Sequence, residues 1–287
     1  SAGIVTANHI RIADNNVPDP SSATYNLSGG QLVSTFQSWI GDGDGAAPVA
    51  TFNQTGGTFT LGAGLGGNDH GLILGGASGS KGVYNISAGR FEEVATNAWA
   101  GDGPGAWNYI GRDGGSEGEL NLSGTGVVSF SGRVHVGGSG TGTVNQTGGL
   151  LEVRNHEIVI GDGGGTGHYN ISAGDIRVAR GIVVGHWENA NADMTISGTA
   201  NIQANEFVVA NRGTGIATIN GGTMNLNTAV RVANQQNGVG TYIQNGGTEC
   251  TSVELWFKAQ DECLRSQICS ISQLSPGYTS VFNVSTC

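Results

Sequence analysis

The chain has 287 residues, with 52 glycines, 12% charged residues and a formal net charge of −10. Glycine far exceeds its usual share of about 7%, but no Gly-x-y period runs through the chain, which excludes collagen. The many Val, Ile and Leu residues exclude a disordered polar chain. The acidic balance without a Lys/Arg cluster argues against nucleic acid as a partner, and no apolar run is long enough for membrane insertion.

Residues 1–22 form the first segment. It contains one strand-like stretch, Gly3 to Ala13, followed by a linker with Pro18 and Pro20. We expect an N-terminal strand or cap here. The chain begins at Ser1 without Met, as a processed mature protein would, and this favours export.

Residues 23–247 carry a repeat with three landmarks. The first is a polar–apolar strand that ends in a Gly pair, as in Tyr-Asn-Leu-Ser-Gly-Gly at 25–30 and Tyr-Asn-Ile-Ser-Ala-Gly at 84–89. Most copies lie roughly 25 residues apart, a period typical of solenoids. The residue before the first Gly or Ala of each copy marks nine coils: Ser28, Thr55, Ser87, Ser123, Thr147, Ser172, Ser197, Asn220 and Asn245.

The second and third landmarks are strands with apolar residues at alternate positions, which predicts one inward and one outward face. Inward residues of the second strand are Phe59, Leu61, Val128, Phe130, Leu151, Val153, Ile176, Val178, Met224 and Leu226. The last inward residues of the third strand are Ile40, Leu74, Ile110, Val136, Ile160, Val184, Val209 and Val232. Two positions earlier lie Leu72, Val134, Ile158, Ile182, Phe207 and Val230.

Three strands and a Gly-rich loop per coil predict an all-β fold, a three-sided parallel β-helix (β-solenoid) of about nine coils, which we expect to be right-handed. Stacked coils bury a continuous aliphatic core that a single coil cannot cover. At the spacing of a parallel ladder, nine coils give a rod about 40 Å long. A β-propeller needs about 40–50 residues per blade, and a left-handed hexapeptide helix needs a strict six-residue period that is missing.

Two coils carry insertions, near 62–70 and near 95–106, between their second and third strands. We expect both to project from one edge in adjacent coils, where binding faces of solenoids often form. Trp99, Trp107 and Tyr109 lie at the second insertion and could stack on sugar rings or pack under the long loop. Trp39 and Trp187 lie on other coils.

Residues 248–287 break the repeat, beginning at Glu249, which falls where an apolar residue belongs. Ser252 to Gln267 could form an amphipathic helix with an apolar face of Val253, Trp256, Phe257, Leu264 and Ile268. All four cysteines lie in this segment, at Cys250, Cys263, Cys269 and Cys287. Their spacing is unlike that of a zinc site and predicts two disulfides in an oxidising compartment. We expect a disulfide-stapled C-terminal cap or docking segment.

The repeat resembles the Gly-rich repeats of bacterial extracellular β-solenoids, above all those of autotransporter-passenger and PEP-CTERM-type surface proteins. The resemblance covers about residues 23–247 and rests on lines such as Tyr-Asn-Ile-Ser-Ala-Gly. It implies export, surface display, and adhesion or matrix scaffolding.

Gly-Asp-Gly loops at 41–43, 101–103 and 161–163 raise the question of calcium. Calcium needs six to eight oxygen ligands, and the frame of these loops does not repeat the Gly- and Asp-rich calcium-binding nonapeptide. We expect turn-forming aspartates and no cofactor, with Asp42 and Asp44 as the best remaining calcium candidates. The six histidines share no metal-ligand spacing.

Charged residues on several coils could serve a carbohydrate-active enzyme, since a hydrolase needs two carboxylates about 5–9 Å apart. The alternative is that they are solvated strand residues. Residues expected to point outward are Arg133, His135, Arg154, Glu157, Arg177, Arg180, Glu206 and Arg231. Residues of the insertion-bearing coil are Glu92, Glu93, Asp102 and Asp113.

Seven Asn-x-Ser/Thr sequons occur, and six share one repeat position. They predict either a hydrogen-bonded asparagine ladder along one edge or N-glycosylation. The asparagines are Asn26, Asn53, Asn85, Asn121, Asn145, Asn170 and Asn283.

The sequence thus favours a secreted, non-enzymatic scaffold at the cell surface that associates with itself head to tail. Extracellular polysaccharide is a further candidate partner. A carbohydrate-active β-helix enzyme, either a polysaccharide lyase or a glycoside hydrolase, and a glycan-binding adhesin remain the alternatives.

Overall fold

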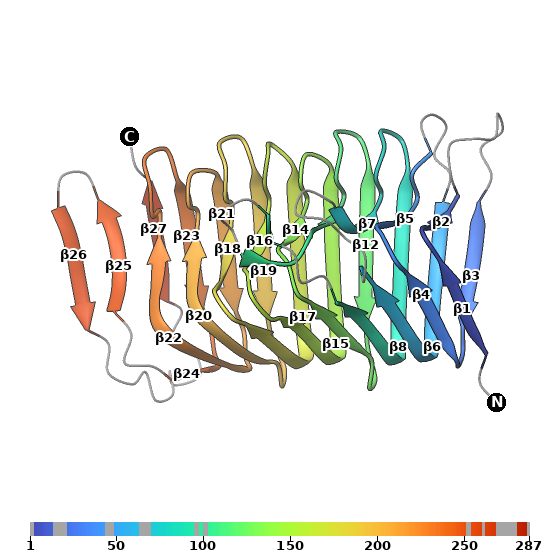
Figure 1. The fold of residues 1–287 in the computed structure, drawn as a ribbon. Helices are drawn as coiled ribbons and strands as arrows, with labels where there is room; N and C mark the ends of the chain where they lie inside the picture. Colours follow the sequence, from blue (N-terminus) through green and yellow to red (C-terminus); the bar gives the residue numbers. More distant parts are fainter. Residues whose placement is uncertain are drawn as a thin grey trace.

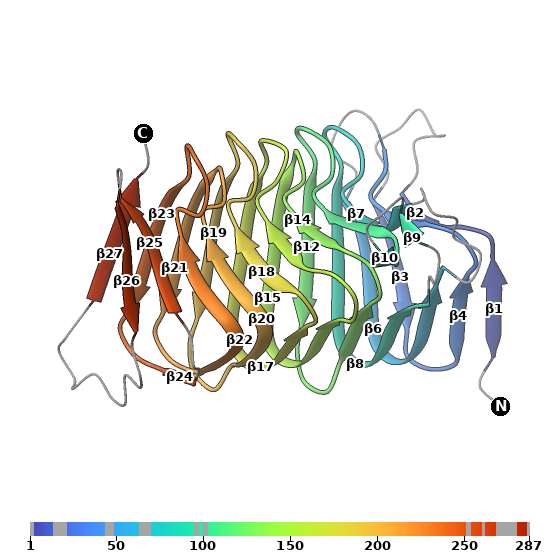
Figure 2. The same ribbon diagram turned by 60° about the vertical axis from the view of Figure 1, so that its left-hand side comes forward.

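The structure, a computed structural model, describes residues 3–13, 22–43, 49–62, 70–94, 98–99, 103–250, 254–259, 262–267 and 280–285. All regular structure in these residues is β-strand, and no helix occurs among them. The strands lie side by side along one long axis, with the first strands at one end and the last at the other (Figures 1 and 2). The chain is therefore an all-β parallel solenoid of about eight turns, with partial turns at its ends.

The parallel pairings fall into three ladders, and several long strands take part in two of them. The first ladder contains β3 (Ala23–Leu27), β6 (Val49–Leu61), β8 (Lys81–Glu93), β12 (Glu117–Leu122), β15 (Thr141–Val153), β17 (Thr166–Val178), β19 (Asn191–Ile196), β21 (Thr214–Ile219) and β23 (Val239–Gln244). The second contains β1 (Ile4–Ala7), β4 (Gln31–Ser34), β6, β8, β13 (Val127–Phe130), β15, β17, β20 (Asn201–Val209), β22 (Thr223–Val232) and β24 (Thr248–Cys250). The third contains β2 (Ile10–Ile12), β5 (Ser38–Ile40), β7 (His70–Leu74), β11 (Trp107–Ile110), β14 (Val134–Val136), β16 (Ile158–Ile160), β18 (Gly181–Val184), β20, β22 and β25 (Glu254–Ala259).

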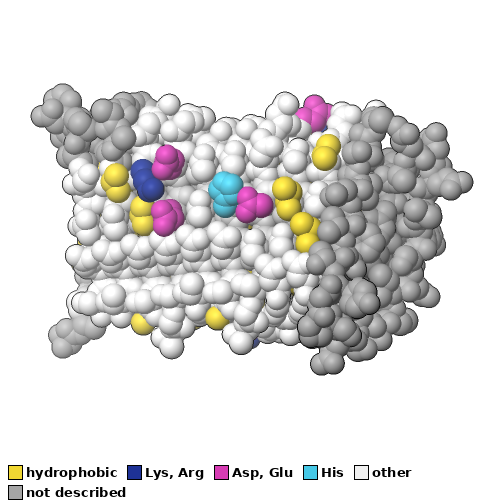
Figure 3. Space-filling view, turned by 180° about the vertical axis from the view of Figure 1, so that it is seen from behind, with side chains coloured by type: hydrophobic (Ala, Val, Ile, Leu, Met, Phe, Trp, Pro, Cys, Tyr) yellow, Lys and Arg dark blue, Asp and Glu magenta, His cyan; other side chains and the backbone are white. Residues whose placement is uncertain are grey.

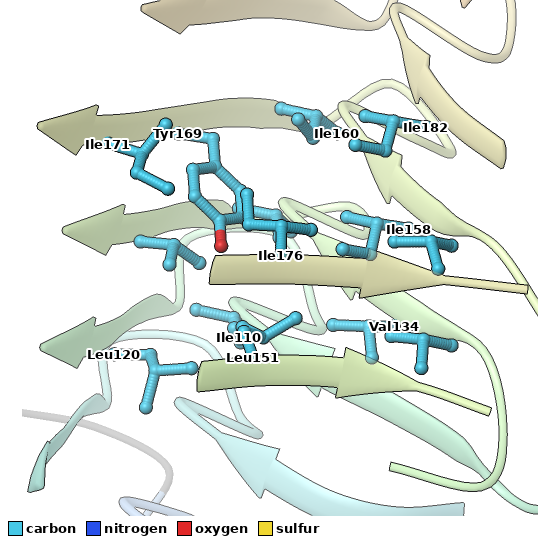
Figure 4. Close-up of a cluster of buried hydrophobic side chains, with 14 of the residues drawn as sticks. Ile110, Leu120, Val134, Leu151, Ile158, Ile160, Tyr169, Ile171, Ile176 and Ile182 are labelled. Atoms are coloured by element: carbon cyan, nitrogen blue, oxygen red, sulfur yellow. The ribbon is translucent and has the colours of Figure 1, made fainter. Parts of the chain in front are cut away.

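The core consists of the aliphatic and aromatic residues that the alternating pattern predicts to point inward. All of the second- and third-strand residues named above as inward are buried. Side chains of successive coils stack in columns, as Leu151 and Ile176 do in Figure 4. Earlier in the same column the residues are aromatic, with the ring centroids of Phe59 and Phe91 5.3 Å apart. Phe130 lies in the neighbouring column, 5.2 Å from Phe91. The inward assignment of both strands is confirmed.

Three inward positions of the first ladder hold glutamine instead of an aliphatic residue, namely Gln54, Gln146 and Gln244. The Oε1 of Gln146 accepts a hydrogen bond of 2.9 Å from the hydroxyl of Tyr169 on the next coil, and its Nε2 donates to the carbonyl of Asp175. Gln54 and Tyr84 repeat the arrangement earlier in the solenoid. Because a buried polar group is costly without a partner, each pair ties one coil to a specific successor.

Glycine is needed where adjacent coils nest against each other at the corner after the third strand. Gly111 has a φ of +77°, and a Cβ there would lie 2.1 Å from the carbonyl oxygen of Thr141. A Cβ at Gly142 would lie 2.1 Å from the carbonyl oxygen of Ile110. Any side chain at either position would push the two coils apart, so the spacing of the ladder depends on these glycines.

Both insertions leave between the second and third ladders in adjacent coils, as expected. The first follows β6 and precedes β7, and the second follows β8 and precedes β11. Within the second, β9 (Ala98–Trp99) and β10 (Gly103–Pro104) pair antiparallel.

The amphipathic helix predicted for Ser252 to Gln267 is wrong. The described residues there form β25 and β26 (Glu262–Gln267), which pair antiparallel. β25 continues the third ladder on β22, and β27 (Ser280–Ser285) lies antiparallel on β23. The spacing of apolar residues in this short segment is compatible with the period of a helix and with that of a strand. The segment forms strands because the edges of β22 and β23 offer backbone groups for pairing.

Replacing Ile160 or Val184 with Asp should abolish the cooperative unfolding transition, because each change buries a charge in the aliphatic core at a cost of several kcal/mol. Thermal denaturation followed by circular dichroism measures the effect. Ile216→Asp is the matched control, since Ile216 is 42% exposed on the outer face of the first ladder. A melt of Val184→Asp that matches the control would contradict the core assignment.

Candidate functional site

The outer face of the third ladder differs from the expected polar surface. Its strands read Ile-Val-Ile, Ile-Val-Val and Phe-Val-Val at 158–160, 182–184 and 207–209, apolar at three successive positions. The middle residues Val159 and Val208 are buried, yet they lie outside the main core cluster, as does Ile73. A continuous apolar run is typical of a strand that is covered on both faces. Assigning these strands by alternation alone misses this signal.

A histidine–aspartate–histidine cluster lies at the edge of this face. The carboxylate of Asp162, in the third Gly-Asp-Gly loop, lies 2.9 Å from Nδ1 of His135 and 3.0 Å from Nδ1 of His186. The three residues come from three consecutive coils and become neighbours only because the coils stack. Burial alone would raise the pKa of Asp162, but the two histidine hydrogen bonds outweigh it and hold this pKa well below its usual range.

His135 is buried, contrary to the expectation that it is solvated. Only 1% of its surface is exposed, and its ring stacks on Tyr109 with centroids 4.7 Å apart. Trp107 lies 5.2 Å away, with the guanidinium of Arg133 over its ring. Burial lowers the pKa of His135 and raises that of Tyr109 to about 12. Trp107 and Tyr109 therefore pack around this histidine, and the side chain of Trp99 lies outside the described residues.

The charged residues beside this cluster form ion pairs. Glu157 pairs with Arg133 and, at 3.7 Å, with Arg180, while Glu206 lies 2.5 Å from Arg231. Glu157 and Glu206 sit two coils apart, with Gly181 on the coil between them. Both carboxylates therefore already have guanidinium partners. The geometry thus gives little support to this pair as a hydrolase dyad.

Glu92 belongs to a second polar network, on the outer face of the second ladder. It lies 3.0 Å from Arg90 and 3.2 Å from Arg154, and these partners lower its pKa, with the Arg90 hydrogen bond as the largest cause. Arg154 also donates to Ser129, whose hydroxyl donates to Glu152. Arg177 lies nearby, 3.9 Å from Asp175.

Glu93 points inward, opposite Leu61 of the preceding coil, and is completely buried. It is therefore not a solvated strand residue. Its carboxylate accepts four hydrogen bonds, from the backbone of Ala106, Ser131 and Gly132 and from the side chain of Asn108, at 2.7–3.2 Å. Glu93 thus holds the end of the second insertion against the next coil.

The outer face of the first ladder is largely uncharged (Figure 3). Lys81 lies 3.4 Å from Glu117 and 3.7 Å from Glu119, and His168 lies 2.5 Å from Asp193. Along its edge, each asparagine Nδ2 donates to the Oδ1 of the preceding one at 2.8–3.2 Å. The row consists of Asn26, Asn53, Asn85, Asn121, Asn145 and Asn170.

This row is the asparagine ladder expected from the sequons. The amides engage one another roughly every 4.8 Å, which supports a structural reason for the repeated asparagine. Glycosylation is untested, and the side chain of Asn283 lies outside the described part of the chain.

Metal and disulfide predictions fall mostly outside the described side chains. Within those that are described, no group of three or more His, Cys, Asp or Glu residues is arranged to hold a metal ion. Asp42 lies over Gly76, where a Cβ would approach its Oδ1 to 2.6 Å. Asp44, Asp102 and the four cysteine side chains are not described, so calcium binding and the disulfides remain predictions.

No helix long and apolar enough to cross a membrane occurs in the described segments.

Acid should destabilise the protein through His135 and Asp162, because both have a pKa below their ordinary values in the folded state. Their stabilisation is complete above the unfolded pKa and is lost as the pH falls, from about 6.5 for His135 and from about 3.9 for Asp162. Melting temperatures measured between pH 8 and pH 4 should decline below about pH 6.5.

His135→Asn keeps an N–H donor for Asp162 but removes the titrating ring, so the decline near pH 6 should weaken. Tyr109→Phe is the control and should keep the parent profile, because the Tyr109 hydroxyl does not titrate in acid. An unchanged decline in His135→Asn would contradict the assignment.

Glu93→Leu should lower the free energy of unfolding by at least about 3 kcal/mol, since each unsatisfied buried donor costs about 1–3 kcal/mol. Urea denaturation measures the loss. Glu93→Gln keeps one acceptor oxygen and should lose less, and Glu188→Leu, at an exposed position, is the control. Equal midpoints for Glu93→Leu and the control would show that the four hydrogen bonds contribute nothing net.

Compared with known proteins, this chain matches no family model, no curated protein and no solved structure.

Proposed function

We propose that this protein is an extracellular structural scaffold, a rod that associates with further copies of itself in a surface layer, fibre or matrix. The solenoid supports this role, because most of the described chain stacks coils around one continuous core. The ion pairs and the asparagine ladder support it further, since they use polar side chains to join one coil to the next. The proposed extracellular location depends on the predicted disulfides among Cys250, Cys263, Cys269 and Cys287.

The observation that carries self-association is the edge of β1. Among the described strands, β1 pairs only with β4, and Ile4 and Val5 are 66% and 54% exposed. Such an edge is a template for strand pairing with another chain. At the other end, β27 and β26 cover β23 and β25, the last strands of the first and third ladders, whereas β24, the last strand of the ladder that contains β1, pairs only with β22 among the described strands. A neighbour's β1 would therefore pair with the outer edge of β24. Repeated head-to-tail contacts that do not close would give a filament.

The proposal includes finer features of the fold. The three ladders support a three-sided coil, and the preference of parallel β connections for one hand supports a right-handed one. The C-terminal strands over β23 and β25 support a cap, which the disulfides would staple.

A carbohydrate-active enzyme is the competing proposal. It depends on acid–base groups on the outer face of the third ladder, where Asp162 holds His186 and where Glu157 and Glu206 lie. The arginine partners of both glutamates weigh against a hydrolase, and the scaffold accounts for more of the chain.

Deleting residues 1–13 should abolish polymers while keeping a β-rich circular dichroism spectrum, because Ile12 is the only one of the described residues 3–13 that belongs to the main buried core. Analytical ultracentrifugation at high protein concentration measures the polymers, and electron microscopy gives their form. Ile4→Lys/Val5→Lys is a milder variant that places charge on the same edge, with Ile216→Lys as its control. A parent chain that sediments as a monomer would refute the scaffold, and four free thiols by mass spectrometry would remove the argument for export.

A further inference from the structure

A groove of about 340 Å³ crosses the outer face of the third ladder next to the histidine–aspartate–histidine cluster. Its floor contains Val183 and Val208, outward residues that pair with each other between β18 and β20. In each coil, the lining residues that precede the outward valine form one wall, and those that follow it form the other. The full lining is Glu157, Arg180, Gly181, Val183, His186, Glu206, Val208, Asn211, Asn234 and Gln235.

Gly181 makes room in one wall of the groove for the side chain of Glu206. It pairs with Glu206 on the following coil, and its neighbour Ile182 pairs with Ile158, the residue after Glu157. The wall therefore lacks a side chain between its two glutamates. A Cβ at Gly181 would lie 2.7 Å from Cγ of Glu206, so the glutamate side chain lies over the glycine.

The two walls offer different hydrogen-bonding groups. The carboxylates of Glu157 and Glu206 accept hydrogen bonds. Across the floor, Nδ2 of Asn234 donates to Oδ1 of Asn211 at 3.0 Å, and each primary amide keeps further donor and acceptor capacity. His186 is oriented by the bond from its Nδ1 to Asp162, which leaves Nε2 as an acceptor in the neutral ring.

These features select among classes of ligand. A peptide strand cannot add here, because β18 and β20 are paired on both sides within the ladder. A strongly charged polymer fits poorly, because the lining combines two carboxylates with the guanidinium of Arg180. An uncharged sugar has apolar ring faces for the valines and hydroxyls that both donate and accept.

Trp187 extends this surface beyond the groove. Its ring lies 5.5 Å from that of His186 and is 45% exposed, with the guanidinium of Arg212 4.6 Å from its centroid. A partly exposed indole offers a flat apolar face on which a sugar ring can stack. The residues singled out earlier for sugar stacking, Trp107 and Tyr109, instead pack around His135.

We propose that this groove binds a short stretch of uncharged oligosaccharide, with ring faces over Val183 and Val208. Sugar hydroxyls donate to Glu157 and Glu206 and accept from Asn211 and Asn234. The groove spans about four coils, roughly 14 Å at the ladder spacing, so it accommodates more than one sugar ring. The site is distinct from the proposed self-association, because it uses the outer face of the third ladder and not the terminal strand edges.

An array of glucans, mannans, xylans and galactans, together with polygalacturonate and alginate as acidic polymers, tests the proposal with the full chain. At least one uncharged glycan should bind, and isothermal titration with it should give affinities for each variant. Asn211→Ala/Asn234→Ala should weaken binding at least tenfold, and Val183→Trp should abolish it by filling the floor. All variants should unfold at the temperature of the parent.

The matched control is Asn220→Ala/Asn245→Ala, which removes an equivalent amide pair, bonded at 2.8 Å, outside the groove. It should bind as the parent does. The proposal is overturned if no glycan on the array binds, if the acidic polymers bind best, or if the groove variants bind like the control. Self-association, measured by sedimentation, tests the scaffold separately, so failure of one proposal leaves the other distinguishable.

Discussion

Every coil of this protein depends on in-register, parallel pairing with the coils before and after it. The inward residues of one coil cover only part of the apolar surface of the next, so no coil is stable alone. Register is strict because a slip of one residue would turn the aliphatic row outward. Nesting glycines such as Gly111 and Gly142 let the coils approach closely enough for the ladder.

The same pairing creates the candidate site. Residues at equivalent positions on consecutive coils become neighbours, which is how Asp162 meets His186, and His135 reaches the same carboxylate from the strand of the preceding coil. Coil stacking thus produces two kinds of polar site, one that faces the core and one that faces solvent. Glu93 faces the core and is satisfied by fixed backbone donors, whereas the groove residues face outward and keep hydrogen-bonding capacity for a ligand.

The fold could largely be predicted from the sequence, because alternation and the Gly landmarks report directly on which residues point inward. The site could not, for two physical reasons. His135 occupies an outward position, and only the three-dimensional packing of Trp107 and Tyr109 buries it. The apolar triplets such as Ile158–Ile160 did carry a signal for the groove, since their middle valine has no place in a strictly alternating strand. In the C-terminal segment, pairing with the exposed ladder edge determined a strand where the local pattern also allowed a helix.

The two glutamine–tyrosine pairs limit how such a chain can gain or lose repeats. A duplicated coil inserted between Gln146 and Tyr169 would separate the buried amide from its hydroxyl unless the new coil brought a tyrosine of its own. The junction between Gln54 and Tyr84 carries the same restriction. Where purely aliphatic columns meet, as at Ile171 and Ile196, a coil can be added or removed without stranding a polar group. Recombination should therefore change the length of the rod at its aliphatic junctions and preserve the order of coils at the glutamine–tyrosine ones.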